Sequence, residues 1–488
     1  MLLLRTTLCS LAMVSALSIS PVAAQNYEPP TNPALSKSGW PIFHRNSYAQ
    51  AGTAARGPEP SDRIEVQFAP TPLGEVSSWT VVTAPYSTGA QAAWGTSRTH
   101  VWKAILDGPR FEIVSSIAMT ERNRFDFDFG IAALADDTVL VTSQSLNEFI
   151  IIGDVQRGNP NSPIGVVRRI KIPSSLGKLS THFSVAFDGT IIFLTRSGTV
   201  GALDPMSGSI ATLPVTPDSG DVAYHNSFPL DEDGGIYLAS QKMMSRVDWN
   251  GTGFVLRWQA PIDFRGPGCP QRTTGRLREA IAVARGKRCT GSGTTPTLLG
   301  SPNDGVVVVV AGWSPQNRMI AFWRGRPPAD WRGLPGYDRQ VAGILPLPRS
   351  SPDGAGFTME NSPSAWGNGL ASAQWNGFSP PCTPVPGVQK TVWDPVRRTL
   401  SLAWETGAVN MNGVTTVSAG SALVYGSGRR DCVYRYYGLD WATGATKLDI
   451  PMGNDPRYLD QGNQSTLAAD RSILFGTAKG LVRIRPSQ

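Results

Sequence analysis

The chain has 488 residues, of which 41% are hydrophobic and 17% charged, and it contains 51 Gly, 39 Pro and 14 Trp. The hydrophobic and Trp content excludes a disordered chain, and the Gly and Pro content is typical of an all-β protein with many turns. The net charge of +7 comes from scattered basic residues, which argues against nucleic-acid binding because proteins of that class gather their basic residues in one patch.

The first 24 residues are predicted to be an export signal. Arg5 supplies a positive charge, Leu8–Ile19 is mostly apolar, and Val22-Ala23-Ala24 provides the small residues of a cleavage site. The apolar run is shorter than the roughly 20 residues of a membrane-spanning helix, and no later run approaches that length. We therefore expect a secreted or periplasmic protein that starts near Gln25 and has no membrane span.

Residues 25–60 are rich in Pro, Ser, Asn and Ala, and we predict that they form an extended arm packed over the domain. Residues 61–488 are predicted to form one domain. Near its start Ile64–Phe68 alternates as a strand does, and Leu481–Ile484 near the C-terminus also has strand character. Pairing of these segments would join both ends of the domain in one sheet.

A repeat inside Thr181–Ser240 indicates the architecture. Thr181–Asp188 and Tyr224–Asp231 both read His-x-Ser-x-x-x-Asp, and each precedes a short β-rich run. The two copies are 43 residues apart, which is close to one blade of a β-propeller. Similar strands and Gly or Asp turns recur along the chain. The prediction is therefore an all-β fold, a closed β-propeller of eight four-stranded blades, with seven as the alternative because the sixth is poorly marked.

Two long loop insertions are predicted on the top face of this propeller. Asp263–Gly291 would lie between blades four and five, and within it Arg276–Arg285 has helix-forming residues. Gly325–Gly387 would lie between blades five and six. Both are expected at the mouth of the central channel.

Four cysteines remain after Cys9 is removed with the signal, and an even number in an exported chain suggests two disulfides. Three pairings are open. We favour Cys269–Cys289 and Cys382–Cys432 because each closes the shorter loop, and both are expected to tether a roof over the channel. A zinc site is the weaker alternative because the chain has no Cys-x-x-Cys pair.

Two segments resemble a known family. Gly201–Gly208 and Gly438–Gly444 are similar to the Ala-Leu-Asp-x-x-Thr-Gly signature of quinoprotein-type propeller repeats. The resemblance implies a PQQ-repeat-like β-propeller and allows a pyrroloquinoline quinone (PQQ) cofactor. The motif itself shapes a turn, however. The chain lacks an adjacent cysteine pair and a Cys-x-x-Cys-His haem site, and Ile210–Val215 lacks the Trp that often ends such repeats.

Residues that open the inner strand of each blade surround the mouth of the channel, where propellers usually bind ligands. His182 and His225 hold equivalent positions, Asp128 matches them in blade two, and Glu360 precedes blade six. Imidazoles beside carboxylates suit acid–base catalysis, so these four are the candidate catalytic residues. The alternatives are a divalent metal site and simple hydrogen bonding between blades. Candidate ligand-binding residues are Asn226, Thr295, Asn361 and Gln464.

Three functions stay open at this stage. The first is an exported lyase or hydrolase that acts on a small organic or sugar-like substrate through acid–base groups. The second is a PQQ-dependent dehydrogenase, and the third is a non-catalytic propeller that binds a protein or an envelope component. We expect a monomer. His44 would reach the channel if the arm folded over it, and no Gly-x-Ser-x-Gly elbow or phosphate-binding loop is visible.

Overall fold

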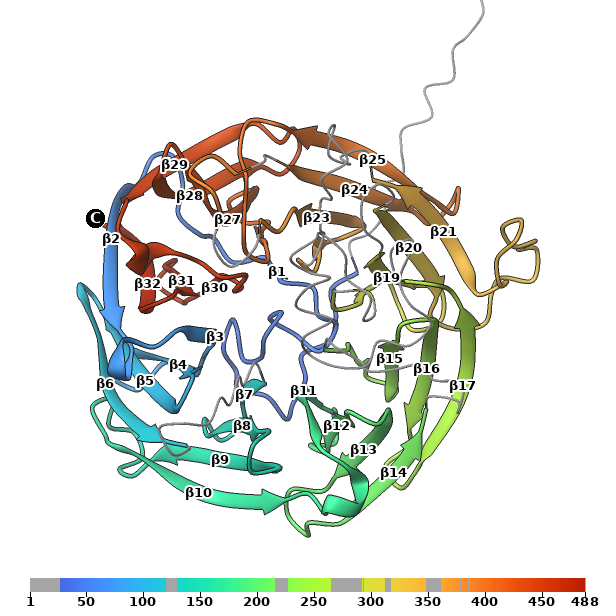
Figure 1. Cartoon of the computed structure of the whole chain (residues 1–488), viewed down its shortest axis with the longest axis horizontal. Coiled ribbons are helices and arrows are strands. Elements are labelled where there is room, and N and C mark those ends of the chain that lie inside the picture. Colours follow the sequence, from blue (N-terminus) through green and yellow to red (C-terminus); the bar gives the residue numbers. More distant parts are fainter. Residues whose placement is uncertain are drawn as a thin grey trace, which may run out of the picture.

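The computed structural model is an eight-bladed β-propeller, with eight sheets arranged around a central axis (Figure 1). It describes residues 27–119, 130–215, 227–264, 292, 294–311, 317–347, 361–376, 380–384 and 387–487. The predicted all-β fold is confirmed, and the blade count is eight rather than seven. Among the described residues, no helix is both long and apolar enough to cross a membrane.

Each blade is an antiparallel sheet, and its strands follow one another outward from the channel. Blade 8 is formed by strands from both ends of the chain. In blade 4 the innermost position is held by Leu230, which forms an isolated bridge with Ile236. Blade 1 contains β3 (Ser77–Val82), β4 (Gln91–Ser97), β5 (His100–Asp107) and β6 (Arg110–Ala118), and blade 2 contains β7 (Ile131–Ala133), β8 (Val139–Ser143), β9 (Glu148–Asp154) and β10 (Ile164–Lys171). Blade 3 contains β11 (Leu179–Val185), β12 (Ile191–Thr195), β13 (Thr199–Leu203) and β14 (Ile210–Pro214), blade 4 contains β15 (Gly235–Ala239), β16 (Met243–Trp249) and β17 (Phe254–Pro261), and blade 5 contains β18 (Thr297–Leu299), β19 (Val306–Ala311), β20 (Arg318–Trp323) and β21 (Val341–Pro346). Blade 6 contains β22 (Ser364–Trp366), β23 (Gly369–Ala373), β24 (Val388–Asp394) and β25 (Thr399–Thr406), and blade 7 contains β26 (Thr416–Ser418), β27 (Leu423–Arg430), β28 (Val433–Asp440) and β29 (Thr446–Gly453).

Blade 8 closes the ring. It contains β30 (Thr466–Leu467), β31 (Ile473–Gly476), β32 (Gly480–Ser487) and, as its outer strand, β2 (Arg63–Pro70). β2 and β32 pair antiparallel along their whole length, from Arg63 opposite Ser487 to Pro70 opposite Gly480. This confirms the predicted pairing of Ile64–Phe68 with Leu481–Ile484. Closure stabilises the fold because it leaves no blade with an unpartnered face.

The core consists of slabs of apolar side chains between neighbouring blades. Both faces of the middle strands are covered, so these strands are continuous apolar runs rather than alternating ones. In β19, for example, Val306 to Val310 are all fully buried. Short 3₁₀ turns, Pro72–Gly74, Ser174–Leu176 and Pro456–Tyr458, lie in the connections that lead from the outer strand of one blade to the inner strand of the next. We call the face that carries these connections the crossover face.

The prediction that Gly325–Gly387 is a loop insertion between blades five and six is wrong over most of that segment. Gly325–Gly387 contains β21 of blade 5 and the two inner strands of blade 6, β22 and β23. The strand pattern was hidden because β22 has only three residues and β23 is made of small residues, Gly-Leu-Ala-Ser-Ala. The first predicted insertion, including the helix predicted for Arg276–Arg285, lies almost entirely outside the described residues.

The disulfide Cys382–Cys432 is present. Cys382 lies in the connection between β23 and β24 of blade 6, and Cys432 lies in the turn between β27 and β28 of blade 7. The bond therefore joins two neighbouring blades through their second-to-third-strand connections. Cys269 and Cys289 lie outside the described residues, so their pairing stays a prediction.

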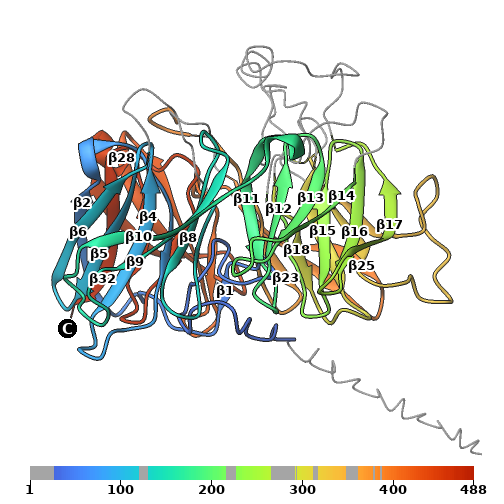
Figure 2. The ribbon, with the colours of Figure 1, turned by 90° about the horizontal axis from the view of Figure 1, so that it is seen from below.

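The N-terminal arm lies inside the ring, where it follows the channel wall (Figures 1 and 2). Its contacts reach all eight blades. In blade 3 the Val185 carbonyl accepts from Asn32 Nδ2 at 2.8 Å, and in blade 8 Gln464 Oε1 accepts from the His44 N–H at 2.6 Å. In the other six blades an inner-strand N–H donates to an arm carbonyl: Val82 to Trp40, Ala133 to Pro41, Leu230 to Ser47, Leu298 to Tyr48, Ala365 to Gln50 and Val417 to Ala51.

These contacts explain why the arm occupies the channel. The inner strand of a blade presents unpaired N–H and C=O groups on its inner edge, and buried backbone groups need partners. The arm supplies them, and its strand β1 (Gly52–Thr53) pairs in parallel with β26. The path has a conformational cost, because His44, Arg45, Ala49 and Ala51 adopt positive φ, which non-Gly residues rarely do.

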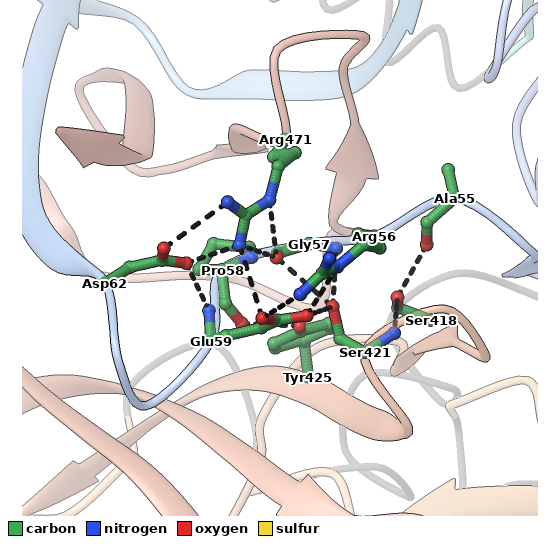
Figure 3. A network of polar contacts seen from close by, with 10 residues as sticks. All are labelled: Ala55, Arg56, Gly57, Pro58, Glu59, Asp62, Ser418, Ser421, Tyr425 and Arg471. Carbon is green, nitrogen blue, oxygen red and sulfur yellow. Dashed lines mark hydrogen bonds and ion pairs between the residues drawn. The ribbon is translucent and has the colours of Figure 1, made fainter. Parts of the chain in front are cut away.

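The end of the arm leaves the channel between blades 7 and 8 (Figure 3). The Arg471 guanidinium of blade 8 donates to Asp62 Oδ2 at 2.5 Å and to the Gly57 carbonyl at 3.0 Å. On the other side, the Tyr425 hydroxyl of blade 7 donates to the Pro58 carbonyl at 2.6 Å. The arm is thereby fixed to both blades just before β2 begins.

Candidate channel site

The arm comes nearest to the crossover face at Phe43 and His44. Crossover connections lead into the inner strands, so residues at the start of an inner strand lie closest to that face. His44 contacts Thr295 and Gln464, which come two residues before β18 and β30 begin. Trp40 instead contacts Val82, the last residue of β3. We call Phe43–His44 the arm apex, and the candidate channel site is its immediate surroundings.

Four aromatic rings pack together at the arm apex. The ring centroids of His44 and Trp79 are 4.7 Å apart, edge to face, and Phe43 packs against Trp79 at 5.5 Å. The His182 ring lies 5.4 Å from Phe43. Trp79 belongs to blade 1 and His182 to blade 3, so the arm brings together side chains from two blades that are not neighbours.

His44 is a fully buried imidazole with a neutral ring. Its Nε2 lies 3.0 Å from Thr295 Oγ1, which is itself 2.7 Å from Ser227 Oγ. Burial, with a smaller contribution from the nearby His182, lowers the pKa of His44 to about 3. The imidazole is therefore uncharged at neutral pH, and it exchanges hydrogen bonds with a chain of hydroxyls.

The buried side-chain atoms at the arm apex that have no hydrogen-bond partner among the described residues include His44 Nδ1 and Gln464 Nε2. Both side chains are deeply buried, at 0% and 2% exposure. They are adjacent, because Gln464 Oε1 accepts from the backbone N–H of His44. Buried polar atoms are rarely left without partners, so this pair marks a place where a ligand atom or a water is expected.

The predicted site residues divide into three groups. His182, Thr295 and Gln464 are brought together around the arm apex, and His182 lies in β11 with 7% of its surface exposed. Asn361 instead uses its amide between blades 6 and 7, donating to the carbonyls of Ala373 at 3.2 Å and Asn412 at 3.3 Å. The remaining four lie outside the described residues: His225, Asp128, Glu360 and Asn226.

Hydroxyl groups near the starts of the inner strands bind neighbouring blades to one another. Thr295 contributes twice, since its N–H also donates to Ser362 Oγ of blade 6 at 2.8 Å. The Ser227–Thr295 contact is hydrogen bonding between blades of the kind that the sequence left as the alternative to a functional role for the His-x-Ser motifs. Further links are Ser364 to Thr415 at 2.6 Å, Thr416 to the Ser465 carbonyl at 2.5 Å and Thr466 to the Thr80 carbonyl at 2.6 Å.

Trp79, Phe43 and Asp460 are not among the site residues predicted from the sequence, and His44 is only a minor candidate there. One signal was available for the arm: Trp40-Pro41-Ile42-Phe43 is too apolar for an exposed linker. Asp460, in the connection before β30, is buried, and burial raises the pKa of its carboxyl to about 6. Its Oδ1 accepts from the N–H groups of Gly462 and Asn463.

The described residues do not fit the cofactors that the fold suggests. Among them no group of three or more His, Cys, Asp or Glu side chains is placed to hold a metal ion. A flat, anionic quinone needs cationic partners and an open slot on the channel axis. At the arm apex the described lining provides hydroxyls, amides and uncharged His44, and the rings of Phe43 and Trp79 pack there instead.

Comparison with known proteins identifies the fold. No family model matches the chain. A quinohemoprotein alcohol dehydrogenase from Comamonas testosteroni superposes with a TM-score of 0.56 over 92% of this chain and 81% of that one, at 12% identity. The fold is a PQQ-repeat-like β-propeller. A europium-containing methanol dehydrogenase gives a TM-score of 0.55 over 92% of this chain and 97% of that one, at 10% identity. At these identities the likeness concerns the fold alone.

A relative in sequence covers most of the chain. A protein of Archaeoglobus fulgidus described as uncharacterized is 28% identical over 478 residues, which cover 94% of this chain and 89% of that protein.

Proposed function

We propose that this chain is an exported propeller that binds a small polar organic or sugar-like ligand in its channel, between the arm apex and the crossover face. The observation that carries the proposal is a pair of buried polar atoms, His44 Nδ1 and Gln464 Nε2, for which the described residues provide no hydrogen-bond partner. A ligand hydroxyl or carbonyl that reached them would accept from Gln464 and exchange a hydrogen bond with His44.

The surrounding groups support the same class of ligand. Trp79 and Phe43 provide aromatic surface, against which sugar and aromatic rings pack well. His182 is the imidazole beside them, and we assign to it the role of proton donor or acceptor in a lyase or hydrolase reaction. Loss of such a group typically costs about 100- to 10,000-fold in rate. His225, Asp128 and Glu360 stay predicted members of this acid–base set.

The proposal is tested by ligand binding. Purified protein would be screened by thermal shift against neutral sugars, uronic acids and small aromatic alcohols, and each hit repeated with Gln464→Ala and His182→Ala. We expect Gln464→Ala to lower the affinity for the ligand by at least about tenfold, because the substitution removes a buried hydrogen-bond donor. His100→Ala is the matched control, since His100 lies at the start of β5, away from the arm apex.

Activity on a ligand found in this way tests the acid–base role. His182→Ala should lower turnover per folded molecule by about 100- to 10,000-fold. A His182→Ala/His225→Ala double variant should have turnover little below that of either single variant, because groups that act together lose their effect together. Turnover within about threefold of wild type would reject the role.

A non-catalytic scaffold is the second candidate, and the hydrogen bonds between blades favour it. They show a structural use for Thr295 and Asn361, two of the predicted ligand-binding residues. A screen without hits, together with a Gln464→Ala variant that loses thermal stability only, would favour the scaffold over the ligand-binding proposal.

A further inference from the structure

A small pocket lies on the side of the arm that faces away from the crossover face. Its volume is about 130 Å³, and all of its lining residues belong to the arm, between Glu28 and Ser47. Beside the pocket, Asn32 contacts the channel wall at Val185, the last residue of β11, and Ser36 contacts it at Ala133, the last residue of β7. The arm thus separates this pocket from the candidate channel site, so the two can be tested independently.

Arg45 is the cation of this pocket, and no described carboxylate forms an ion pair with it. One donor of its guanidinium is used, from Nη1 to the Gly52 carbonyl at 2.5 Å. A guanidinium has five N–H donors, so four find no acceptor among the described residues. The backbone holds Arg45 at a φ of 72°, in the left-handed region, directly after His44 at 58°. Strained residues of this kind often mark functional sites.

A second donor faces the same space. The Ser47 hydroxyl oxygen accepts from Asn32 Nδ2 at 3.0 Å, and its own hydrogen has no acceptor among the described residues. The remaining Arg45 donors are not buried atoms, and an anion that supplies oxygen acceptors would replace water at them. Partial burial of the side chain lowers the pKa of Arg45, an effect that the charge of Glu28 opposes.

We propose that Arg45, assisted by Ser47, binds a small oxyanion in this pocket, either the carboxylate of a small organic acid or free phosphate. The planar fork of a guanidinium matches two oxygens of either group and binds them in pairs. The pocket volume suits an anion of this size. Nothing in the proposed channel function requires this anion.

Glu28 is the acidic group that lines the same pocket. Its carboxylate acts on Arg45 through charge, without an ion pair between them. An anion that enters the pocket is therefore repelled by Glu28 and attracted by Arg45. This opposition gives the test two variants with opposite expected effects.

The experiment is a titration of the purified protein with sodium acetate and with sodium phosphate. Ionic strength is held constant with KCl, because added salt alone screens exposed charges. Binding is followed by calorimetry and, for phosphate, by ³¹P line broadening. We expect one anion per chain, at least about tenfold weaker binding in Arg45→Gln, and an intermediate loss in Arg45→Lys, which keeps the charge but not the fork.

Glu28→Gln should bind the anion at least about twofold more tightly, because a repelling charge is removed. Arg56→Gln is the matched control: Arg56 also lies on the arm, but it is exposed and pairs with Glu59, so affinity should not change. Binding of acetate alone or phosphate alone assigns the ligand class. The proposal is overturned if the wild-type protein binds neither anion. It is also overturned if folded Arg45→Lys and Arg45→Gln variants bind the anion as tightly as the wild type does.

Discussion

Arg324 Nη2 lies 2.9 Å from Asp231 Oδ2, and both side chains are completely buried. Arg324 follows β20 of blade 5, and Asp231 precedes β15 of blade 4. The same Arg324 nitrogen donates to the hydroxyl of Tyr48 at 3.1 Å, which in turn donates to Glu232 at 2.6 Å. This ion pair therefore holds two blades and the arm together at one point.

Breaking this pair should strongly destabilise the protein. Arg324→Met or Asp231→Asn leaves one uncompensated buried group, which typically costs about 3–5 kcal/mol. Tyr48→Phe removes hydrogen bonds and should cost about 1–3 kcal/mol. Urea denaturation measures these changes. The control is Arg397→Gln, which breaks an exposed pair with Asp394 and should cost less than about 1 kcal/mol. A comparable loss in the control and in Arg324→Met would contradict this account.

The arm should detach from blade 7 when a side chain is added at Gly52, where the arm packs tightly against the channel wall. A Cβ at Gly52 would overlap the Ala365 carbonyl oxygen, so Gly52→Ala should displace β1 from β26. Hydrogen exchange should then rise at the inner-strand amides that donate to the arm, including Ala365 and Val417. Gly253→Ala is the control, because nothing lies within 4 Å of its Cβ position. Unchanged protection in Gly52→Ala would show that the arm is not held at this point.

Asp460 should make stability depend on pH. Burial raises its pKa from 3.8 to about 6, so between these values the folded protein holds a proton that the unfolded chain has released. Stability should therefore fall as pH rises through this window, by up to about 3 kcal/mol from this group. Asp460→Asn should remove that contribution. Urea denaturation of both proteins between pH 4 and 7 checks it, and parallel curves would refute the assignment.

Loss of the Cys382–Cys432 disulfide should destabilise the propeller. The two residues are 50 positions apart, and opening a loop of that length typically costs about 2–5 kcal/mol. Cys382→Ser with Cys432→Ser tests this by denaturation. Peptide mapping without reduction should recover the Cys382–Cys432 link. It also tests the predicted Cys269–Cys289 pair, for which free thiols would be the contrary result.

Removal of the last strand should affect the whole ring. Deleting Leu481–Gln488 takes away most of the partner of β2 and the buried Arg483, which pairs with Asp470. Because the ring closes through this pairing, we expect a large fall in the melting temperature and loss of protection in blade 1 as well as blade 8. A melting temperature close to that of the full chain would mean that closure adds little.

Local sequence determined the blade architecture. In blade 3 the turn Asp188-Gly189 separates β11 from β12 and the turn Met206–Gly208 separates β13 from β14, because Gly and Asp turns and β-branched runs act over a few residues. The closing strands were also readable, since Ile64–Phe68 alternates and Leu481–Ile484 has strand character by itself. The inner strands of blade 6 were not, because three residues of β22 carry too little pattern to be distinguished from a loop.

The surroundings of His182 were decided only by tertiary structure. The repeat placed His182 at the channel and suggested His225 as its neighbour, but the described ring beside it is Phe43, with His44 next in sequence, from a segment more than a hundred residues away. Nothing local in Trp40–Arg45 states that unpaired N–H groups on the inner edges of the blades will take up this arm. Each strand follows from its own residues, but the inner edges of the blades exist only once the ring has formed. The arm occupies the channel because the unpaired backbone groups of all the assembled blades require hydrogen-bond partners there.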